Sequence, residues 1–242
     1  MSRTTQHTLT LPWVEKATQG FVFCDDMRQA VSLAIAAGVN LIFSGPGGHA
    51  KSEFLAAVFE AISGQEPFIK SFGQGTGTEE LFGGIDFDAL NRPQGAALQY
   101  NPTHSFLDRR IAVLEELFDA PPRVLTALKD VLTAKELRNG HQRHPMLTRV
   151  IAAATNHSPQ EIAEGGPEIE ALIQRFPIQL EVKWSRYGKP EFAQLFATVI
   201  GRVGGEPQGV TWADVEALQQ RSKAPLWQVL ACNSCWPRLC RS

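Results

Sequence analysis

The sequence lacks long apolar segments and has no excess of charge of either sign. In 242 residues, 23 Lys and Arg residues nearly balance 25 Asp and Glu residues, which gives a formal net charge of −2. Such a balance gives no electrostatic reason to expect a nucleic-acid partner. The most apolar segment, residues 29–44, is interrupted by Asn40 and then by glycines, so it is not suited to span a membrane.

We also expect no secretion signal. Residues 1–6 are polar and do not combine a cationic start with a following apolar stretch. We therefore expect a cytoplasmic protein, without a membrane or nucleic-acid partner.

Cysteine is scarce, and its distribution is uneven. Cys24 stands alone, whereas Cys232, Cys235 and Cys240 all fall within the last eleven residues. The Cys232-x-x-Cys235 pair could be half of a zinc site or a redox pair, but no histidine lies nearby in the sequence to complete a metal site. One such pair is a weak signal, so we expect residues 226–242 to be a disordered tail that contains thiols.

The sequence contains enough apolar residues, 43% of the total, for one large α/β domain. Short apolar runs that resemble buried strands alternate with segments of helical periodicity. Predicted strands cover residues 40–44, 68–72, 111–114, 149–154 and 178–182; predicted helices cover 25–37, 53–62, 123–137, 168–174, 190–203 and 211–221. This alternation predicts a doubly wound, mainly parallel sheet. Between these elements we expect a loop with a short helical turn at 73–84, an irregular stretch with a potential hairpin at 91–107, and a turn at Asn139-Gly140.

A glycine-rich turn follows the first predicted strand and precedes a helix. Its residues are Gly45, Pro46, Gly47, Gly48, His49, Ala50, Lys51 and Ser52. This is the layout of a phosphate-binding loop, in which backbone N–H groups and a helix N-terminus hold an anion. Lys51 would supply a positive charge to the phosphates, and Ser52 a hydroxyl to Mg²⁺.

Two glutamates follow the apolar run at residues 111–114. Ligands of open α/β sheets bind at the carboxyl ends of the strands, which is where Glu115 and Glu116 are predicted to lie. Glu115 would then hold Mg²⁺, directly or through water, and Glu116 would polarise the attacking water. The alternative is a solvated acidic pair at a helix start, where carboxylates are favoured.

Two further polar residues fit a nucleotide site. Asn156 follows a predicted strand, and its amide can hydrogen-bond both a γ-phosphate and the attacking water, although asparagine is also a common turn residue. Arg175 precedes the last predicted strand, and its planar guanidinium could reach a phosphate in a neighbouring subunit. Considered alone, Arg175 is more typical of a surface arginine near the C-terminus of a helix.

These elements occur in the same order, and at similar separations, in AAA+ ATPases, and the chain most resembles the MoxR family and its RavA-like branch. The segments that carry the resemblance are GPGGHAKS at 45–52, FGQGTGTEELFG at 72–83, VLEELFDAPPRVLTALKDVLTAKELRNG at 113–140, IAAATN at 151–156 and EALIQRFPIQLEV at 170–182. Together they cover most of residues 20–185.

The resemblance implies a fold, a set of site residues and partners. Residues 45–52 are similar to Walker A, residues 111–116 to Walker B, Asn156 to sensor 1 and Arg175 to an arginine finger. It implies an ATP site between subunits of a ring, commonly a hexamer, with segments 73–84 and 137–146 facing the pore. It also implies a chaperone-like remodelling function that uses ATP and Mg²⁺, often beside a partner with a von Willebrand factor A domain.

The sequence departs from this family pattern at three places. Ala50 replaces the usual last glycine of the loop, which we expect to be tolerated in a right-handed helical conformation. Glu115 replaces the usual aspartate, and its longer arm suggests slower turnover because Mg²⁺ demands tight geometry. We expect a core at 1–185 and a partial helical lid at 186–225, with no assignable sensor-2 arginine; either the lid is truncated or a frameshift altered the tail.

The sequence fits two functions. One is an ATP-hydrolysing remodeller, and the other is a nucleotide-dependent assembly module that hardly hydrolyses, which Glu115 and the short lid favour. A third option, a small-molecule kinase with a P-loop, is disfavoured by the Glu115-Glu116 pair together with Asn156 and Arg175.

Overall fold

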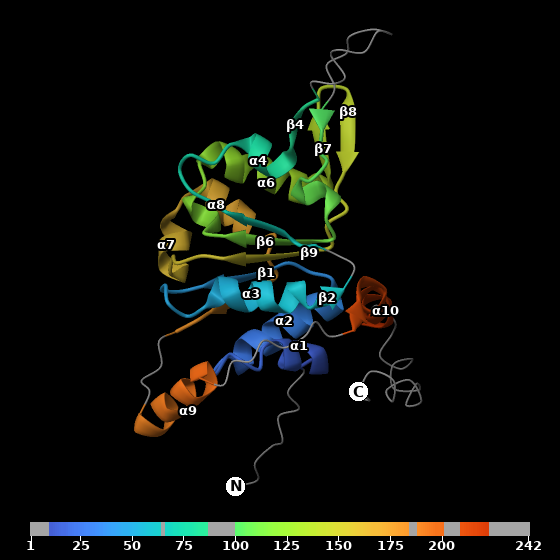
Figure 1. Ribbon diagram of the computed structural model, residues 1–242. Coiled ribbons are helices and arrows are strands. Elements are labelled where there is room, and N and C mark those ends of the chain that lie inside the picture. Colours follow the sequence, from blue (N-terminus) through green and yellow to red (C-terminus); the bar gives the residue numbers. More distant parts are fainter. Residues whose placement is uncertain (1–9, 64–65, 87–99, 184–187, 201–208, 223–242) are drawn as a thin grey trace.

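A computed structural model describes residues 10–63, 66–86, 100–183, 188–200 and 209–222 (Figure 1). A five-stranded sheet forms its centre, and every pair of neighbouring strands in it is parallel. The strands are β1 (Leu41–Ser44), β3 (Phe68–Ser71), β6 (Ile111–Glu115), β9 (Val150–Ala154) and β10 (Ile178–Glu181). Each predicted strand is therefore present within one or two residues of its expected bounds.

The spatial order of the strands is β10-β1-β9-β6-β3. After β1 the chain crosses to the far edge at β3 and returns through β6 and β9, before β10 forms on the other side of β1. The direction of winding thus reverses beside β1, and such a switch point is where open α/β sheets bind ligands. The three strands that precede the predicted site residues, β1, β9 and β6, are adjacent.

Helices cover both faces of the sheet (Figure 1). One face carries the helices on the N-terminal side of the chain, and the opposite face carries those that follow the later strands. The first group is α1 (Pro12–Ala17), α2 (Asp25–Ala37) and α3 (Lys51–Glu60); the second is α4 (Thr78–Phe82), α6 (Pro122–Ala134), α7 (Pro159–Glu164) and α8 (Pro167–Ile173). The predicted doubly wound α/β architecture is confirmed.

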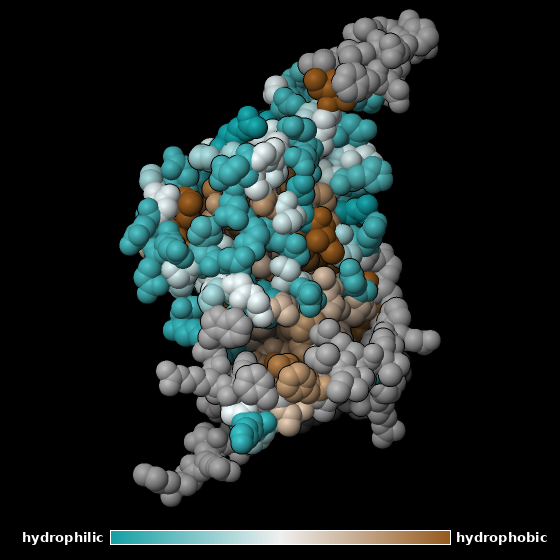
Figure 2. Space-filling model, turned by 60° about the vertical axis from the view of Figure 1, so that its left-hand side comes forward, coloured by the Kyte–Doolittle hydropathy of each residue, from teal (hydrophilic) through white to brown (hydrophobic). Residues whose placement is uncertain are grey.

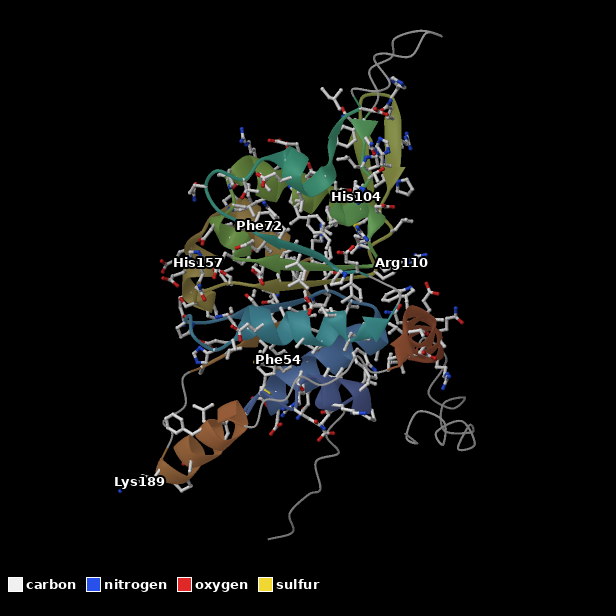
Figure 3. The ribbon with its side chains drawn as sticks, in the orientation of Figure 1. Phe54, Phe72, His104, Arg110, His157 and Lys189 are labelled. Atoms are coloured by element: carbon white, nitrogen blue, oxygen red, sulfur yellow. The ribbon has the colours of Figure 1, made fainter. Side chains whose placement is uncertain are left out.

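Successive side chains of each strand point to opposite faces of the sheet and pack into two separate apolar cores. In β6, Ala112 and Leu114 belong to the core beneath α6, whereas Ile111 and Val113 belong to the core beneath α3. A strand that is buried on both faces is nearly all apolar, which explains why these runs were recognisable in the sequence. In Figure 3, Phe54 of α3 and Phe72 after β3 mark the two faces.

Two predicted helices end earlier than expected. The helix expected at 53–62 ends at Glu60, because Ile62 belongs to β2 (Ile62–Ser63). The periodicity suggested a helix over residues 123–137, but α6 ends at Ala134 because Lys135 adopts a left-handed conformation with φ of 57°. The next residues form an antiparallel hairpin of β7 (Glu136–Asn139) and β8 (Gln142–Pro145). Gly140, with φ of 59°, lies in its turn, as the Asn139-Gly140 pair indicated.

The irregular regions contain several short elements. Strand β4 (Gly84–Ile85) pairs antiparallel with β5 (Tyr100–Asn101). The partner of β5 therefore precedes the stretch 91–107 in which a hairpin was expected, and residues 91–99 lie outside the described part, so that hairpin stays a prediction. The 3₁₀ helices are η1 (Phe106–Asp108) and η2 (Leu117–Asp119). Helix α7 was not predicted, although Ser158 and Glu161 form a capping box at its start.

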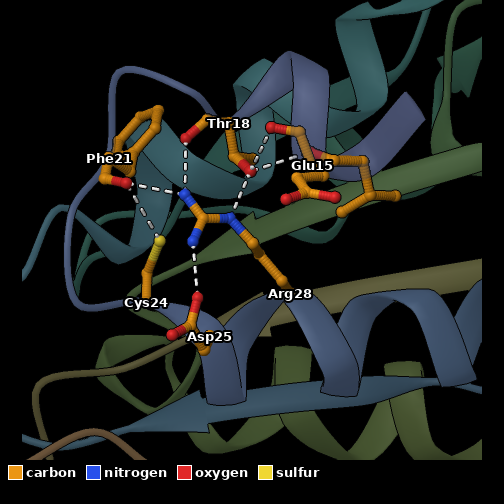
Figure 4. A network of polar contacts seen from close by, with 7 residues as sticks. Glu15, Thr18, Phe21, Cys24, Asp25 and Arg28 are labelled. Carbon is orange, nitrogen blue, oxygen red and sulfur yellow. Dashed lines mark hydrogen bonds and ion pairs between the residues drawn. The ribbon is translucent and has the colours of Figure 1, made fainter. Parts of the chain in front are cut away.

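A polar network around Arg28 fixes the chain before α2 (Figure 4). The Arg28 guanidinium donates to the side-chain and backbone oxygens of Thr18, to the Phe21 carbonyl and to Asp25, at distances of 2.7–2.9 Å. Beside it, burial raises the pKa of the Cys24 thiol to about 11. The helix begins at Asp25, with Cys24 rather than an aspartate at the capping position.

The C-terminal described elements are α9 (Lys189–Ile200), β11 (Val210–Thr211) and α10 (Trp212–Ser222). Strand β11 pairs with β2 (Ile62–Ser63), and Gln219 of α10 donates to the Ile35 carbonyl at 2.9 Å. Helix α10 therefore caps the C-terminal end of α2. The domain division at 186–225 stays a prediction, and the expected tail at 226–242 lies outside the described residues.

No helix among the described residues is long and apolar enough to cross a membrane. Figure 2 shows that hydrophilic residues cover most of the upper half of the face that includes the carboxyl ends of the strands.

Candidate functional site

The glycine-rich loop occupies the carboxyl end of β1, at the switch point of the sheet. Gly45 has φ of 121°, and a Cβ atom at this position would lie 2.2 Å from the Val182 carbonyl oxygen. Gly48 has φ of 86°, another conformation that side chains disfavour. The loop path therefore requires glycine at Gly45 and favours it at Gly48.

The loop also presents backbone donors. Pro46, Gly47 and Gly48 are exposed, and the N–H groups of the two glycines have no hydrogen-bond partner among the described residues. His49 places Nδ1 2.9 Å from the Pro46 carbonyl oxygen, which closes the turn. Ser52 lies half-buried in the first turn of α3, whose N-terminal end adds a partial positive charge. This arrangement fits an anion such as a phosphate.

Ala50 does not have the conformation that the sequence suggested. Its φ of 53° and ψ of 29° are left-handed, not right-handed helical, and it is the capping residue of α3. A left-handed conformation costs a residue with a Cβ atom about 1–2 kcal/mol. The position thus retains the backbone geometry of a glycine even though the residue is alanine.

Lys51 is buried, with 6% of its surface exposed, and its ammonium group makes three hydrogen bonds. It donates to the carbonyl oxygens of Gly45 at 2.8 Å and Pro46 at 2.9 Å, and to Oδ1 of Asn156 at 3.1 Å. Burial lowers the pKa of Lys51, and the charge of Glu116 opposes that shift. The ammonium group therefore sits within electrostatic range of the predicted general base.

Asn156 joins Lys51 to Glu116. Its side-chain amide donates to one carboxylate oxygen of Glu116, and its backbone N–H donates to the other at 3.1 Å. Glu116 has φ of 51°, a strained conformation for a non-glycine residue that costs about 1–3 kcal/mol and is typical of functional sites. Three residues predicted from separate motifs thus form one continuous network.

Glu115 is the last residue of β6 and lies next to this network. Its backbone carbonyl accepts a hydrogen bond from Phe72 N at 2.9 Å, and its side chain is half-buried. The carboxylate has no hydrogen bond or ion pair with the residues that the structure describes. Carboxylate and hydroxyl oxygens are ligands that Mg²⁺ prefers, so Glu115 and Ser52 fit the donor set of that ion.

Behind the network, a second set of contacts went unrecognised in the sequence. His157 Nε2 lies 2.9 Å from Asp119 Oδ1, and the His157 carbonyl accepts from Gly45 N at 3.1 Å. Gln74 Nε2 donates to the Asp119 carbonyl at 3.1 Å. These contacts tie the phosphate loop to segment 73–84. The position of His157 directly after Asn156 was the one sequence signal, and nothing indicated its pairing with Asp119.

Arg175 does not join this cluster within one chain. Its carbonyl accepts from Asn40 Nδ2 at 2.9 Å, just before β1, and its Nε donates to Thr133 Oγ1 at 3.1 Å at the end of α6. Arg175 therefore lies at the amino ends of the strands, whereas Lys51 and Glu116 lie at the carboxyl ends. Figure 3 shows these two ends with Arg110 and His157, respectively.

Within the described residues, no group of three or more His, Cys, Asp or Glu residues is arranged to hold a metal ion. Cys232, Cys235 and Cys240 lie outside this part of the chain, so the zinc alternative stays untested.

Two comparisons bear on the identity of the chain. Its structure is similar to that of a candidate ATPase from Cytophaga hutchinsonii ATCC 33406, with a TM-score of 0.62 and 18% sequence identity. The match covers 86% of this chain and 61% of that protein, and at this identity it supports the fold alone. A family model described as the MoxR domain in the MoxR-vWA-beta-propeller ternary systems matches residues 8–195. Because that match extends over more than half of the sequence, the chain belongs to the MoxR family of AAA+ ATPases.

Proposed function

We propose that this chain binds Mg·ATP and hydrolyses it, as a chaperone-like AAA+ remodelling ATPase. The observation that carries the proposal is the continuous network from Lys51 through Asn156 to Glu116 at the switch point of the sheet. A cation, an amide and a carboxylate at this place match the parts that phosphoryl transfer to water requires.

Each residue of the network has a chemical task in this proposal. The backbone N–H groups of residues 45–52 and the Lys51 ammonium hold the phosphates, while Ser52 and Glu115 hold Mg²⁺. Mg²⁺ would neutralise charge on the phosphate oxygens when bound. Glu116 accepts a proton from the attacking water, and Asn156 fixes both that carboxylate and the γ-phosphate through its amide.

The proposed site is completed by a neighbouring subunit. The location of Arg175 at the amino ends of the strands, away from its own phosphate loop, supports a role toward the nucleotide of the next subunit. Closed head-to-tail contacts of this kind form rings, and a hexamer is the form that the family resemblance favours. Segments 73–84 and 137–146 would then face the pore.

The family description also suggests a partner class. The matching model is named for MoxR-vWA-beta-propeller ternary systems, so a protein with a von Willebrand factor A domain is the proposed partner.

A second candidate function is nucleotide-dependent assembly with little hydrolysis. It is favoured by Glu115, because the carboxylate at the end of β6 reaches Mg²⁺ on a longer arm than the aspartate usual in the family.

Steady-state phosphate release separates the two functions. Purified protein with Mg·ATP should release phosphate well above the rate of a Lys51→Ala variant, which lacks the phosphate-binding cation. Release no faster than in that control, with ATP-dependent assembly retained, would leave the second function only.

A further inference from the structure

Arg175 is held in one orientation by α6. Thr133 Oγ1 donates to the Lys129 carbonyl at 2.8 Å and accepts from Arg175 Nε at 3.1 Å. Because Nε is occupied by Thr133, the two terminal nitrogens of the guanidinium are left for another partner. Neither makes a hydrogen bond or ion pair with a described residue.

Lys135 lies two residues beyond Thr133 and has an unusual backbone conformation. It follows the last residue of α6 and has a left-handed conformation. Its backbone N–H donates to the Val131 carbonyl at 2.8 Å, and the Lys135 carbonyl accepts a hydrogen bond from Met146 N at 2.9 Å. Partial burial of the ammonium group and the nearby charge of Arg175 both lower the pKa of Lys135. Two cations therefore share one small region at the end of α6.

No carboxylate among the described residues pairs with either of these two charges. In the described part of the chain, neither Lys135 nor Arg175 takes part in a salt bridge, whereas the neighbouring Arg138 and Arg143 both lie near Glu136. Holding two like charges together without an acid is unfavourable unless an anion joins them. The pair therefore fits a strongly negative ligand, which no carboxylate of the described residues supplies.

We infer that Lys135 is a second cation acting across the subunit interface, and that it binds the terminal phosphate of the neighbour's ATP together with Arg175. This inference rests on the proposed ring function and adds a residue to its site. The guanidinium fork suits two phosphate oxygens, and the ammonium suits a third as a compact charge. Developing charge on the transferred phosphoryl group would be stabilised by both.

The first test replaces the charge at position 135. Lys135→Gln should lower turnover about tenfold without changing the ATP affinity of the unassembled subunit, which is a typical cost of losing one hydrogen-bonded charge from a phosphoryl-transfer site. Lys135→Arg should retain most of the activity. Lys129→Gln is the matched control on the same helix, because Lys129 already has Asp130 as its ion partner, and it should behave as the parent protein does.

The second test asks whether Lys135 acts in trans. Mixing Lys135→Gln with Lys51→Ala should restore activity, because the second variant offers an intact Lys135 to the intact nucleotide site of the first. Mixing with a Lys51→Ala/Lys135→Gln double variant should restore none. As a readout apart from turnover, Lys135→Gln should also raise the ATP concentration needed for half-maximal assembly, measured by light scattering.

The possible failures are distinguishable. The role proposed for Lys135 is wrong if Lys135→Gln hydrolyses ATP and assembles as the parent protein does. It is also wrong if Lys135→Gln fails to complement Lys51→Ala while Arg175→Ala complements it. In both cases the proposed ring is not contradicted. If Arg175→Ala also fails to complement at every mixing ratio, the shared site itself is wrong, and this inference falls with it.

Discussion

At the residue scale, strain and charge concentrate where the phosphate loop meets the Glu116 carboxylate. Ala50 and Glu116 both have left-handed backbones without being glycine; Ala50 directly precedes Lys51, and Glu116 is the other end of the network that contains Lys51. Such backbone strain persists only where the surroundings determine the conformation, and it clusters at functional sites. The same two residues therefore offer separate tests of structure and of chemistry.

The Glu116→Gln substitution tests the chemistry. We expect it to retain ATP binding and to lower turnover by about a hundredfold or more, because a neutral amide cannot accept the proton of the attacking water. Calorimetry would measure the affinity, and phosphate release the turnover. Hydrolysis at the parental rate would remove Glu116 from the role of general base.

The Ala50→Gly substitution tests the strain. Glycine adopts φ of 53° without a steric cost, although it gains more entropy in the unfolded chain. We expect a net increase in the free energy of unfolding of about 0.5–1 kcal/mol, since relief of a left-handed alanine outweighs that entropy. Denaturant unfolding would measure it, and a decrease of that size would show that the left-handed assignment is wrong.

At the scale of elements, α6 connects the two ends of the proposed mechanism. It begins just after the short helix η2, near the carboxyl end of β6, and it ends at Ala134, between Thr133 and Lys135, close to Arg175. A single rigid helix therefore spans from the predicted general base of one site to the cations proposed for the next. Its length fixes how far apart those two groups lie.

Removal of the Thr133 hydroxyl should weaken the orientation of Arg175. We expect Thr133→Val to lower turnover about fivefold, equivalent to about 1 kcal/mol for one lost hydrogen bond, with little change in stability because Thr133 is exposed. Thr126→Val on the same helix is the control. Equal rates for the two valine variants would show that the bond to Arg175 has no functional consequence.

Most features set by residues close together in the sequence could be predicted, whereas most contacts between distant segments could not. The sheet strands were predictable because both faces of β6 and β9 are buried, which requires unbroken apolar runs. Lys51, Asn156 and Glu116 were predictable as a cluster because parallel strands end at one edge. The early end of α6 could not be predicted, because Lys135 ends the helix without a glycine or proline. The Asp119–His157 contact could not be predicted either, because it joins two loops.

At the scale of the whole molecule, charge is distributed unevenly between the two ends of the sheet. One set of cations lies at the amino ends, near the acids Glu66 and Asp108, and one set of carboxylates lies at the carboxyl ends, near Lys51 and Lys183. The first set includes Arg110, Lys135, Arg149 and Arg175, and the second includes Glu115, Glu116, Asp119 and Glu181. This polarity favours head-to-tail association of copies even though the net charge is only −2.

Assembly should therefore depend on ionic strength. Raising the salt concentration from about 0.05 M to about 0.5 M shortens the screening length several-fold and should shift ATP-bound protein toward smaller species. Sizing by light scattering at several salt concentrations would measure this shift. Assembly that is unaffected or strengthened by salt would indicate an interface dominated by apolar contacts.

The most direct measurement is calorimetric titration of ATP into the parent protein and into Lys51→Ala and Glu115→Gln, each with and without Mg²⁺. The account predicts saturable binding that Mg²⁺ strengthens in the parent, binding that is lost in Lys51→Ala, and binding in Glu115→Gln that no longer responds to Mg²⁺. Undetectable uptake of ATP by the parent protein, or the same affinity in all three, would contradict it.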